Sequence, residues 1–177
     1  MNKKEKQINA IIYILEKYPN IGRTKLMKAI FFMDLIWYNK YKETIFEDNY
    51  IRMPNGPVPL TAYKLTDIKK ANPYIKIKLQ KTTSKHKKYD FFPLIKANME
   101  DFSQEMIDIL EKIISFLQKY AATSISEFTH NFRLWSSLED GEKIPKELFN
   151  LDEYEINLLN AKNALKKQKN FQFKHMK

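Results

Sequence analysis

Residues 52–59 read RMPNGPVP and hold three of the chain's seven prolines and one of its three glycines. Such a concentration of rigid and permissive residues indicates a local constraint on the backbone. The preceding segment, FEDNYIRM (46–53), has the β-forming Tyr50 and Ile51 and is expected to be a short strand. PNGP then forms a turn, and VPLTAYKLTDIKK (58–70) is expected to be a short helix that proline opens. The stretch therefore separates a strand from a helix.

Two helices are expected before this stretch. Apolar residues recur at helical spacing over residues 8–15, and that helix should end before Pro19. A second helix should run from about residue 24 to about residue 41, with Leu26, Ile30 and Trp37 on one face. We expect the two to pair in the core. Asp34, inside the second helix, should cap a neighbouring element or pair with a lysine.

The sequence after the proline-rich stretch predicts a β-hairpin over residues 74–95. YIKIKLQ alternates strictly, so Ile75, Ile77 and Leu79 share one face while Lys76 and Lys78 share the other. A polar loop, KTTSKHKK, separates this strand from YDFFPLI. The hairpin is therefore expected to have one apolar face and one wet face.

The rest of the chain is expected to be helical. Three capping boxes predict three helix starts, at Asp101 with Gln104, at Ser124 with Glu127, and at Asp152 with Glu155. We predict an α+β fold, with a mainly helical body and a small antiparallel sheet or hairpin, in the order α-α-β-α-β-β-α-α-α. Residues 1–165 should form a single domain, and the basic residues 166–177 a flexible C-terminal tail.

Composition narrows the classes of function. The chain of 177 residues has no cysteine, which excludes a disulfide scaffold and a thiolate metal site and suits a reducing compartment. No apolar run is long enough to cross a bilayer, so we expect a cytoplasmic location. The net charge of +10 suits a nucleic acid or an acidic protein as partner, or solubility alone. Lysine far outnumbers arginine, the residue better suited to bidentate contacts with bases, so the composition gives little support to sequence-specific recognition of nucleic acid.

Catalytic motifs are missing from the sequence. His86, His130 and His175 have no second histidine or carboxylate at zinc-ligand spacing. Neither a glycine-rich phosphate loop nor a G-x-S-x-G elbow is present. The sequence therefore predicts a protein that is not an enzyme and that has no cofactor and no metal.

The hairpin carries the best candidate for nucleic-acid contact. Its strand face and loop hold a set of lysines that could follow a phosphate backbone. The set is Lys76, Lys78, Lys81, Lys85, Lys87 and Lys88. The alternative interpretation is an exposed edge that lysines protect against strand-to-strand aggregation.

Three sequence motifs occur in order along the chain: TKLMKAIFFMDLIWYNKY, then FEDNYIRMPNGPVPLTAYKL, then SISEFTHNFRLWSSLEDGEKIP. Together they resemble the Panacea family, the SocA-like antitoxin domain of bacterial and phage toxin–antitoxin systems. The resemblance covers about residues 24–145. The family's turn falls on Gly56, Pro57 and Val58, and the aromatic of the next helix on Tyr63. A later histidine–tryptophan pair falls on His130 and Trp135.

The sequence departs from the family pattern in places. Asn55 stands where the family has an aromatic residue, and Phe32 where it often has tyrosine. The resemblance implies that Gly56 takes a backbone angle closed to other residues, and that Pro57 starts the next helix. It also implies that His130 is a structural histidine that holds a late helix against a turn or a backbone carbonyl.

The resemblance implies an antitoxin-like binding protein that neutralises a cognate toxin by direct complex formation, or as an adaptor that delivers the toxin to a protease. Aromatic residues with a lysine rim should form the interface. The candidates are Tyr38, Tyr41, Phe46, Arg52 and Asn55. Two alternatives remain open: a nucleic-acid-binding regulator that uses the 74–95 hairpin, and a phage counter-defence protein that binds an immune component. The sequence leaves the oligomeric state open.

Overall fold

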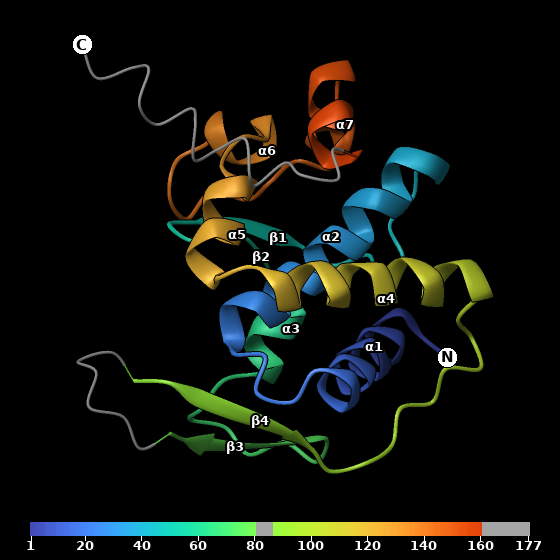
Figure 1. The fold of residues 1–177 in the computed structure, drawn as a ribbon, viewed down its shortest axis with the longest axis vertical. Helices are drawn as coiled ribbons and strands as arrows, with labels where there is room; N and C mark the ends of the chain where they lie inside the picture. The colour runs from blue at the N-terminus through green and yellow to red at the C-terminus, as the bar shows by residue number, and fades with distance from the viewer. Residues whose placement is uncertain (81–86, 161–177) are drawn as a thin grey trace.

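Helices make up most of the molecule, with two small sheets beside them (Figure 1). The computed structural model describes residues 1–80 and 87–160. Its elements are α1 (Lys3–Lys17), α2 (Arg23–Tyr41), β1 (Tyr50–Met53), β2 (Gly56–Pro59), α3 (Leu60–Leu65), β3 (Ile75–Leu79), β4 (Tyr89–Pro93), α4 (Gln104–Lys119), α5 (Ala122–Thr129), α6 (Arg133–Ser136), the 3₁₀ turn η1 (Lys146–Phe149) and α7 (Glu153–Asn160). Each sheet is an antiparallel pair, β1 with β2 and β3 with β4. The predicted α+β class is confirmed.

Helix α2 is the centre of the core. It contacts α1, α3, α4, α5, β2 and η1. The face predicted to be apolar is buried, but so are residues on the other sides of the helix, including Lys28 and Asp34. A helix that is buried all round needs partners on every side, and these six elements supply them. Within residues 1–80 and 87–160, none of the helices is both long and apolar enough to span a membrane.

Helix α1 follows the sequence prediction closely. It ends at Lys17, before Pro19. At its start, Asn2 Oδ1 accepts from the Glu5 N–H at 2.9 Å, and Glu5 Oε2 accepts from the Asn2 N–H at 3.0 Å. This reciprocal capping box satisfies two backbone donors that a helix start leaves free.

The predicted helix directly after the turn is wrong at its start. Residues 56–59 form β2, and α3 begins only at Leu60, with Pro59 in the N-cap position. Pro57 lies opposite Arg52 in the ladder. The backbone N–H and C=O of Arg52 bond to Glu142 and Gly141 on its other side. This pair is therefore not joined by ladder hydrogen bonds, so a proline at position 57 removes none of them.

Two of the three predicted capping boxes are wrong. Ser103 caps α4 by accepting from the Met106 N–H at 3.2 Å, while Asp101 pairs with the N-terminal amine. Ser124 lies inside α5, which begins after Ala121. The box of Asp152 and Glu155 is confirmed, since each side chain accepts from the other's backbone N–H, at 2.9 and 3.0 Å.

The predicted hairpin over residues 74–95 is confirmed. Strands β3 and β4 pair in register, with Ile77 opposite Phe91. Ile75 and Phe91 are buried, and β4 is the strand that packs against α1. The predicted loop lysines Lys81 and Lys85 lie outside the described residues.

Candidate functional site

The β1–β2 corner is built around Gly56, which has φ +100°. A Cβ atom at this position would lie 2.5 Å from Lys28 Nζ and would overlap the Thr129 hydroxyl. Glycine is therefore required both by the backbone angle and by the close approach of α2 and α5 to the turn. The predicted angle at Gly56 is confirmed.

Lys28 is the buried anchor of this corner. Its Nζ donates to the Pro57 carbonyl at 3.0 Å, and its side chain is fully buried. Burial lowers the pKa of Lys28 to about 7, because the charged form loses its hydration. The proline-rich turn is thus fixed to the central helix by one hydrogen bond from an enclosed amine.

Trp135 fixes the other side of the corner. Its Nε1 donates to the Met53 carbonyl at 2.8 Å. The His130 ring stacks on it at 3.6 Å with an interplanar angle of 12°, and the Arg52 guanidinium lies 3.9 Å from its ring. Arg52 also pairs with Asp140. The histidine–tryptophan pair thus contacts the turn that precedes Gly56.

The environment of His130 favours its neutral form. Burial is the largest cause that lowers its pKa, and the Lys28 charge acts in the same direction. Hydrogen bonding with the Pro54 backbone opposes the shift. Among the described residues, the buried His130 Nε2 and Arg52 Nε have no hydrogen-bond partner. Stacking, the cation–π contact and the Trp135 hydrogen bond to Met53 together hold this side of the corner.

The other turn residues also have packing contacts. Val58 is buried in β2. The Arg23 guanidinium lies 3.7 Å from the Tyr63 ring and donates to the Tyr63 carbonyl at 2.7 Å. The motif residues after the turn therefore attach α3 to the start of α2.

Asp34 holds the loop that follows α2. Its Oδ1 accepts from the N–H groups of Ile45 and Phe46, at 2.7 and 3.1 Å, and its Oδ2 accepts from the Tyr50 hydroxyl at 2.7 Å. Burial raises the pKa of Asp34 to about 7, against the effect of these hydrogen bonds. Of the two expectations for Asp34, the lysine pair is wrong, and the carboxylate instead holds backbone N–H groups of the loop that leads to β1. Sequence reasoning could not choose this outcome over a lysine pair.

The predicted partner residues do not form one surface. Phe46 is 3% exposed and belongs to the core, so it cannot contact a partner in this conformation. The Arg52 side chain is mostly covered, whereas Asn55 is exposed at the turn. Tyr41 is 43% exposed at the end of α2, and Tyr38 is half-buried against Phe149. The corner and Tyr41 are also far apart. Lys28 contacts the corner, and Tyr41 lies thirteen residues further along α2, which is about 20 Å at the rise of an α-helix.

A groove of about 510 Å³ lies beside the C-terminal half of α2, between α4 and α7. Its lining residues are Ile36, Asn39, Lys40, Ile109, Lys112, Ile156, Leu159 and Asn160. Ile156 is 38% exposed, and Lys40 and Lys112 are exposed. Sequence reasoning missed this groove because α7 forms one of its walls. Its only sequence signal was the aromatic and basic end of α2.

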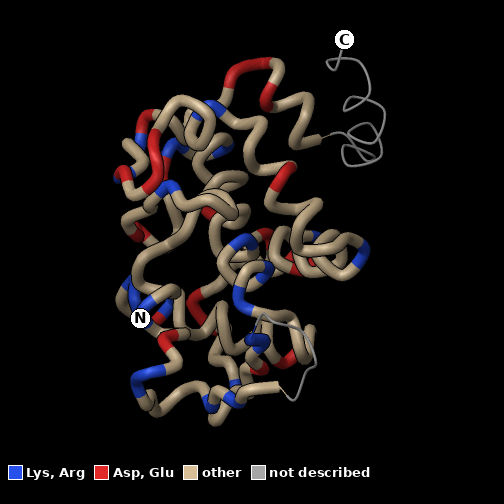
Figure 2. The backbone as a smooth tube through the Cα atoms, turned by 90° about the vertical axis from the view of Figure 1, so that its left-hand side faces the viewer, with Lys and Arg blue, Asp and Glu red and all other residues tan. Residues whose placement is uncertain are grey.

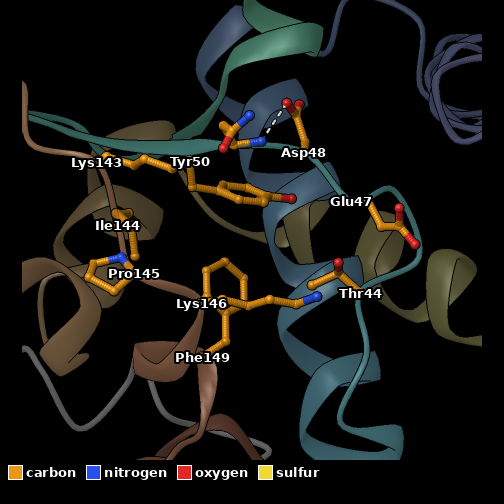
Figure 3. A pocket seen from close by; sticks show the side chains of 10 residues that line it. Thr44, Glu47, Asp48, Tyr50, Lys143, Ile144, Pro145, Lys146 and Phe149 are labelled. Carbon is orange, nitrogen blue, oxygen red and sulfur yellow. Dashed lines mark hydrogen bonds between the residues drawn. The ribbon is translucent and has the colours of Figure 1, made fainter.

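A second hollow, of about 390 Å³, lies between the 44–50 segment and residues 143–149 (Figure 3). The Tyr50 ring lies near Phe149, with 5.1 Å between ring centroids. The Lys146 side chain extends toward Thr44 (Figure 3). Asp48 is held by the N–H and hydroxyl of Thr61 and by Gln7. The polar groups of this hollow are thus largely engaged in holding the fold.

Outside these two hollows, the hairpin presents the predicted lysines. Lys76, Lys78, Lys87 and Lys88 are all exposed. Within residues 1–80 and 87–160, no group of three or more histidine or acidic side chains lies close enough to hold a metal ion.

The comparisons with known proteins give one match. A search of curated proteins and a search of solved structures each found nothing similar to this chain. The family model "Antitoxin SocA-like, Panacea domain" matches residues 26–136. This range contains Lys28, the Gly56 corner, and both His130 and Trp135. The chain therefore belongs to the SocA-like antitoxin family, through its Panacea domain.

Proposed function

We propose that this protein neutralises a cognate protein toxin by binding it directly, without catalysis, through the groove between α2, α4 and α7. The observation that carries the proposal is the groove itself. It is an apolar hollow with exposed lysines at its side, in a chain of the SocA-like antitoxin family.

The groove has the composition of a helix-binding site. Ile36, Ile109, Ile156 and Leu159 give it an apolar floor, and Lys40 and Lys112 give it basic sides. An amphipathic helix buries its apolar face in such a groove and places its polar residues at the rim. The partner segment should therefore be a helix with apolar residues at i, i+3, i+4 and i+7 and acidic residues beside them.

Charge supports an acidic partner. The chain has a net charge of +10, which speeds the encounter with an acidic surface. Lys112 has no ion pair among the described residues, whereas Lys40 already pairs with Glu105. Lys112 is therefore the lysine whose reversal should weaken capture most.

The test is co-expression with the adjacent gene, using growth and co-purification as readouts. The wild-type chain should restore growth and co-purify with the toxin. Ile156→Asp should lose both, because it places a charge in the apolar floor. Ile95→Asp is the matched control, since Ile95 is also exposed but does not line the groove. A toxin that remains lethal beside the wild-type chain, or that is neutralised without forming a complex, would contradict the proposal.

Co-expression also distinguishes the adaptor mechanism. Simple neutralisation leaves the amount of toxin unchanged, whereas delivery to a protease lowers the toxin's half-life. Measuring that half-life with and without this chain separates the two. A counter-defence role would use the same surface with an immune component in place of the toxin.

Nucleic-acid binding is the second candidate, and the exposed lysines of the hairpin favour it. Phosphate contacts would make duplex affinity fall steeply with salt concentration. Lys87→Glu with Lys88→Glu should then weaken binding to any duplex sequence by a similar factor. If the chain does not bind duplex at low salt, this function is excluded.

A further inference from the structure

The β3–β4 sheet has an edge, along β3, that is not paired with any other strand of residues 1–80 and 87–160. It contains two strands, and β4 is the one that packs against α1. Within the described residues, no backbone hydrogen bond joins β3 to any strand other than β4. The hairpin lies at the end of the molecule away from α7 (Figure 1). Among the described residues no strand is paired on the outer side of β3, so a third strand could be added there.

The register identifies the backbone groups at this edge. Gln80 N–H donates to the Lys88 carbonyl at 2.9 Å, and Leu94 N–H donates to the Tyr74 carbonyl at 2.8 Å. The even-numbered residues of β3 therefore direct their backbone groups toward β4. Ile77 and Leu79 direct theirs outward. Ile75 N–H, the next outward donor, is already taken by Asn72 Oδ1 at 2.7 Å.

The side chains beside the edge are basic and apolar. Lys76 and Lys78 are exposed on the outer face, with Phe92 opposite Lys76 and 39% exposed. Lys78 Nζ lies 5.4 Å from the Phe92 ring. On the inner face Leu79 is 57% exposed. Basic residues also mark this end of the backbone (Figure 2).

Among the described residues, the lysines of this face are not held in ion pairs, although Asp90 lies opposite Lys78. No ion pair within residues 1–80 and 87–160 involves Lys76 or Lys78. Asp90, opposite Lys78, instead accepts from the Gln80 side chain. A second copy of this chain would bring the same lysines to the edge and would be repelled. An acidic strand would be attracted.

We propose that the outer edge of β3 binds an extended, acidic segment of a partner protein as a third strand. Strand addition supplies main-chain hydrogen bonds to Ile77 and Leu79, and alternate side chains supply specificity. Because side chains alternate between faces, the segment should carry acidic residues beside Lys76 and Lys78 and apolar residues beside Ile77 and Leu79. This edge lies apart from the groove, so the proposal goes beyond the proposed function and does not depend on it.

Two features favour a protein strand over a nucleic acid. The edge offers backbone donors and acceptors at strand spacing, which a phosphate backbone does not match. The exposed Leu79 is an apolar contact for a side chain, and it contributes nothing to phosphate binding. Nucleic-acid binding by the same lysines is an outcome that the experiment can reveal.

The experiment is a titration of the ¹⁵N-labelled full chain with a decapeptide of alternating glutamate and valine, followed by NMR. Strand addition should shift the Ile77 and Leu79 amide signals and slow their hydrogen exchange. The Lys76 and Lys78 amides already face β4, so their exchange should change less. Raising the salt concentration from about 50 mM to about 300 mM should weaken the binding of the peptide by about tenfold, because the lysines are exposed.

Leu79→Pro removes the outward N–H at a position where the ladder with β4 loses no hydrogen bond. This substitution should weaken the binding of the peptide by about tenfold. Leu79→Ala keeps that N–H and is the matched control, with a weakening of about threefold or less. The spectra of both variants report whether the hairpin is intact. Lys76→Glu with Lys78→Glu should abolish binding of this peptide.

Three results would overturn the proposal. The first is unchanged exchange at Ile77 and Leu79 when the peptide is bound. The second is that a peptide made of glutamate alone binds as tightly as the glutamate–valine peptide, which would show that charge alone accounts for the binding. The third is a short DNA duplex that shifts the same amides more strongly than the peptide, which would assign the edge to nucleic acid.

Discussion

Gly56→Ala tests the packing of the corner most sharply. The substitution should lower the free energy of unfolding by about 2–6 kcal/mol, as the sum of two costs. A positive φ that lies outside the left-handed helical region costs an L-residue about 1–3 kcal/mol. The new methyl group must also displace Lys28 Nζ and the Thr129 hydroxyl, and overpacking of this kind costs about 1–3 kcal/mol.

Gly141→Ala is the matched control for this prediction. Gly141 also has a positive φ, +89°, but a Cβ atom there would meet nothing within 4 Å. It should therefore show the backbone cost alone, about 1–3 kcal/mol. The difference between the two variants measures the close approach of α2 and α5 to the turn.

Chemical denaturation followed by circular dichroism measures both free energies. At about 2–4 °C per kcal/mol for a chain of this size, Gly56→Ala should lower the Tm by about 4–24 °C. The reasoning is refuted if Gly56→Ala and Gly141→Ala cost the same. In Gly56→Ala combined with Thr129→Ala, which removes the overlapping hydroxyl, part of the lost stability should return.

Three further predictions concern Lys28, Asp34 and Trp135. Because burial lowers the pKa of Lys28 to about 7, the unfolded chain binds more protons than the folded chain between about pH 7 and 10.5. The free energy of unfolding should therefore rise with pH across that window. Denaturation curves measured at several pH values should show this rise for the wild-type chain and not for Lys28→Met. Asp34→Ala should cost about 3–5 kcal/mol, since it leaves two backbone N–H groups without an acceptor and the Tyr50 hydroxyl with only its 3.5 Å contact to the Ile30 carbonyl. A loss below about 1 kcal/mol would mean that water replaces the carboxylate. Trp135→Phe should cost about 1 kcal/mol through the hydrogen bond to Met53, and Trp135→Ala about 2–4 kcal/mol because stacking is lost as well; equal melting temperatures for the two variants would show that the ring contributes nothing.

The corner could be located from the sequence, but the segment directly after Gly56 was assigned wrongly. Prolines at positions 57 and 59 argue against a strand, so the sequence favours a helix there. A strand is possible there because Pro57 and Pro59 lie opposite Arg52 and Tyr50, whose backbone groups bond outward to residues 141–144. That outer segment is far away in the sequence. A pattern over a few residues carries no information about such a partner.

The same limit applies to the caps and to the groove. At the start of α4, Asp101 and Ser103 are both possible N-cap residues, and local spacing alone does not separate them. The groove needs α7 to lie beside α2 and α4, which no local period predicts. By contrast, the β3–β4 register was predictable, because a slip of one residue would expose Ile75 and bury Lys76.

The burial of Lys28 and Asp34 was also beyond sequence reasoning. Charged residues on a helix usually face solvent, and α2 is buried all round only because six elements cover it. Asp34 finds its partners in the loop after the same helix, and Lys28 finds its partner in β2.

The most direct test of the account is a calorimetric measurement of the dissociation constant between the purified chain and the product of the adjacent gene, which the proposal takes to be its toxin. The wild-type chain should form a stoichiometric complex. Ile156→Asp should weaken that complex by about 30-fold to 1000-fold, as expected for about 2–4 kcal/mol of an unpaired charge in an apolar contact. An unchanged dissociation constant for Ile156→Asp, with Ile95→Asp also unchanged, would show that the toxin binds elsewhere and would contradict the proposed role of the groove.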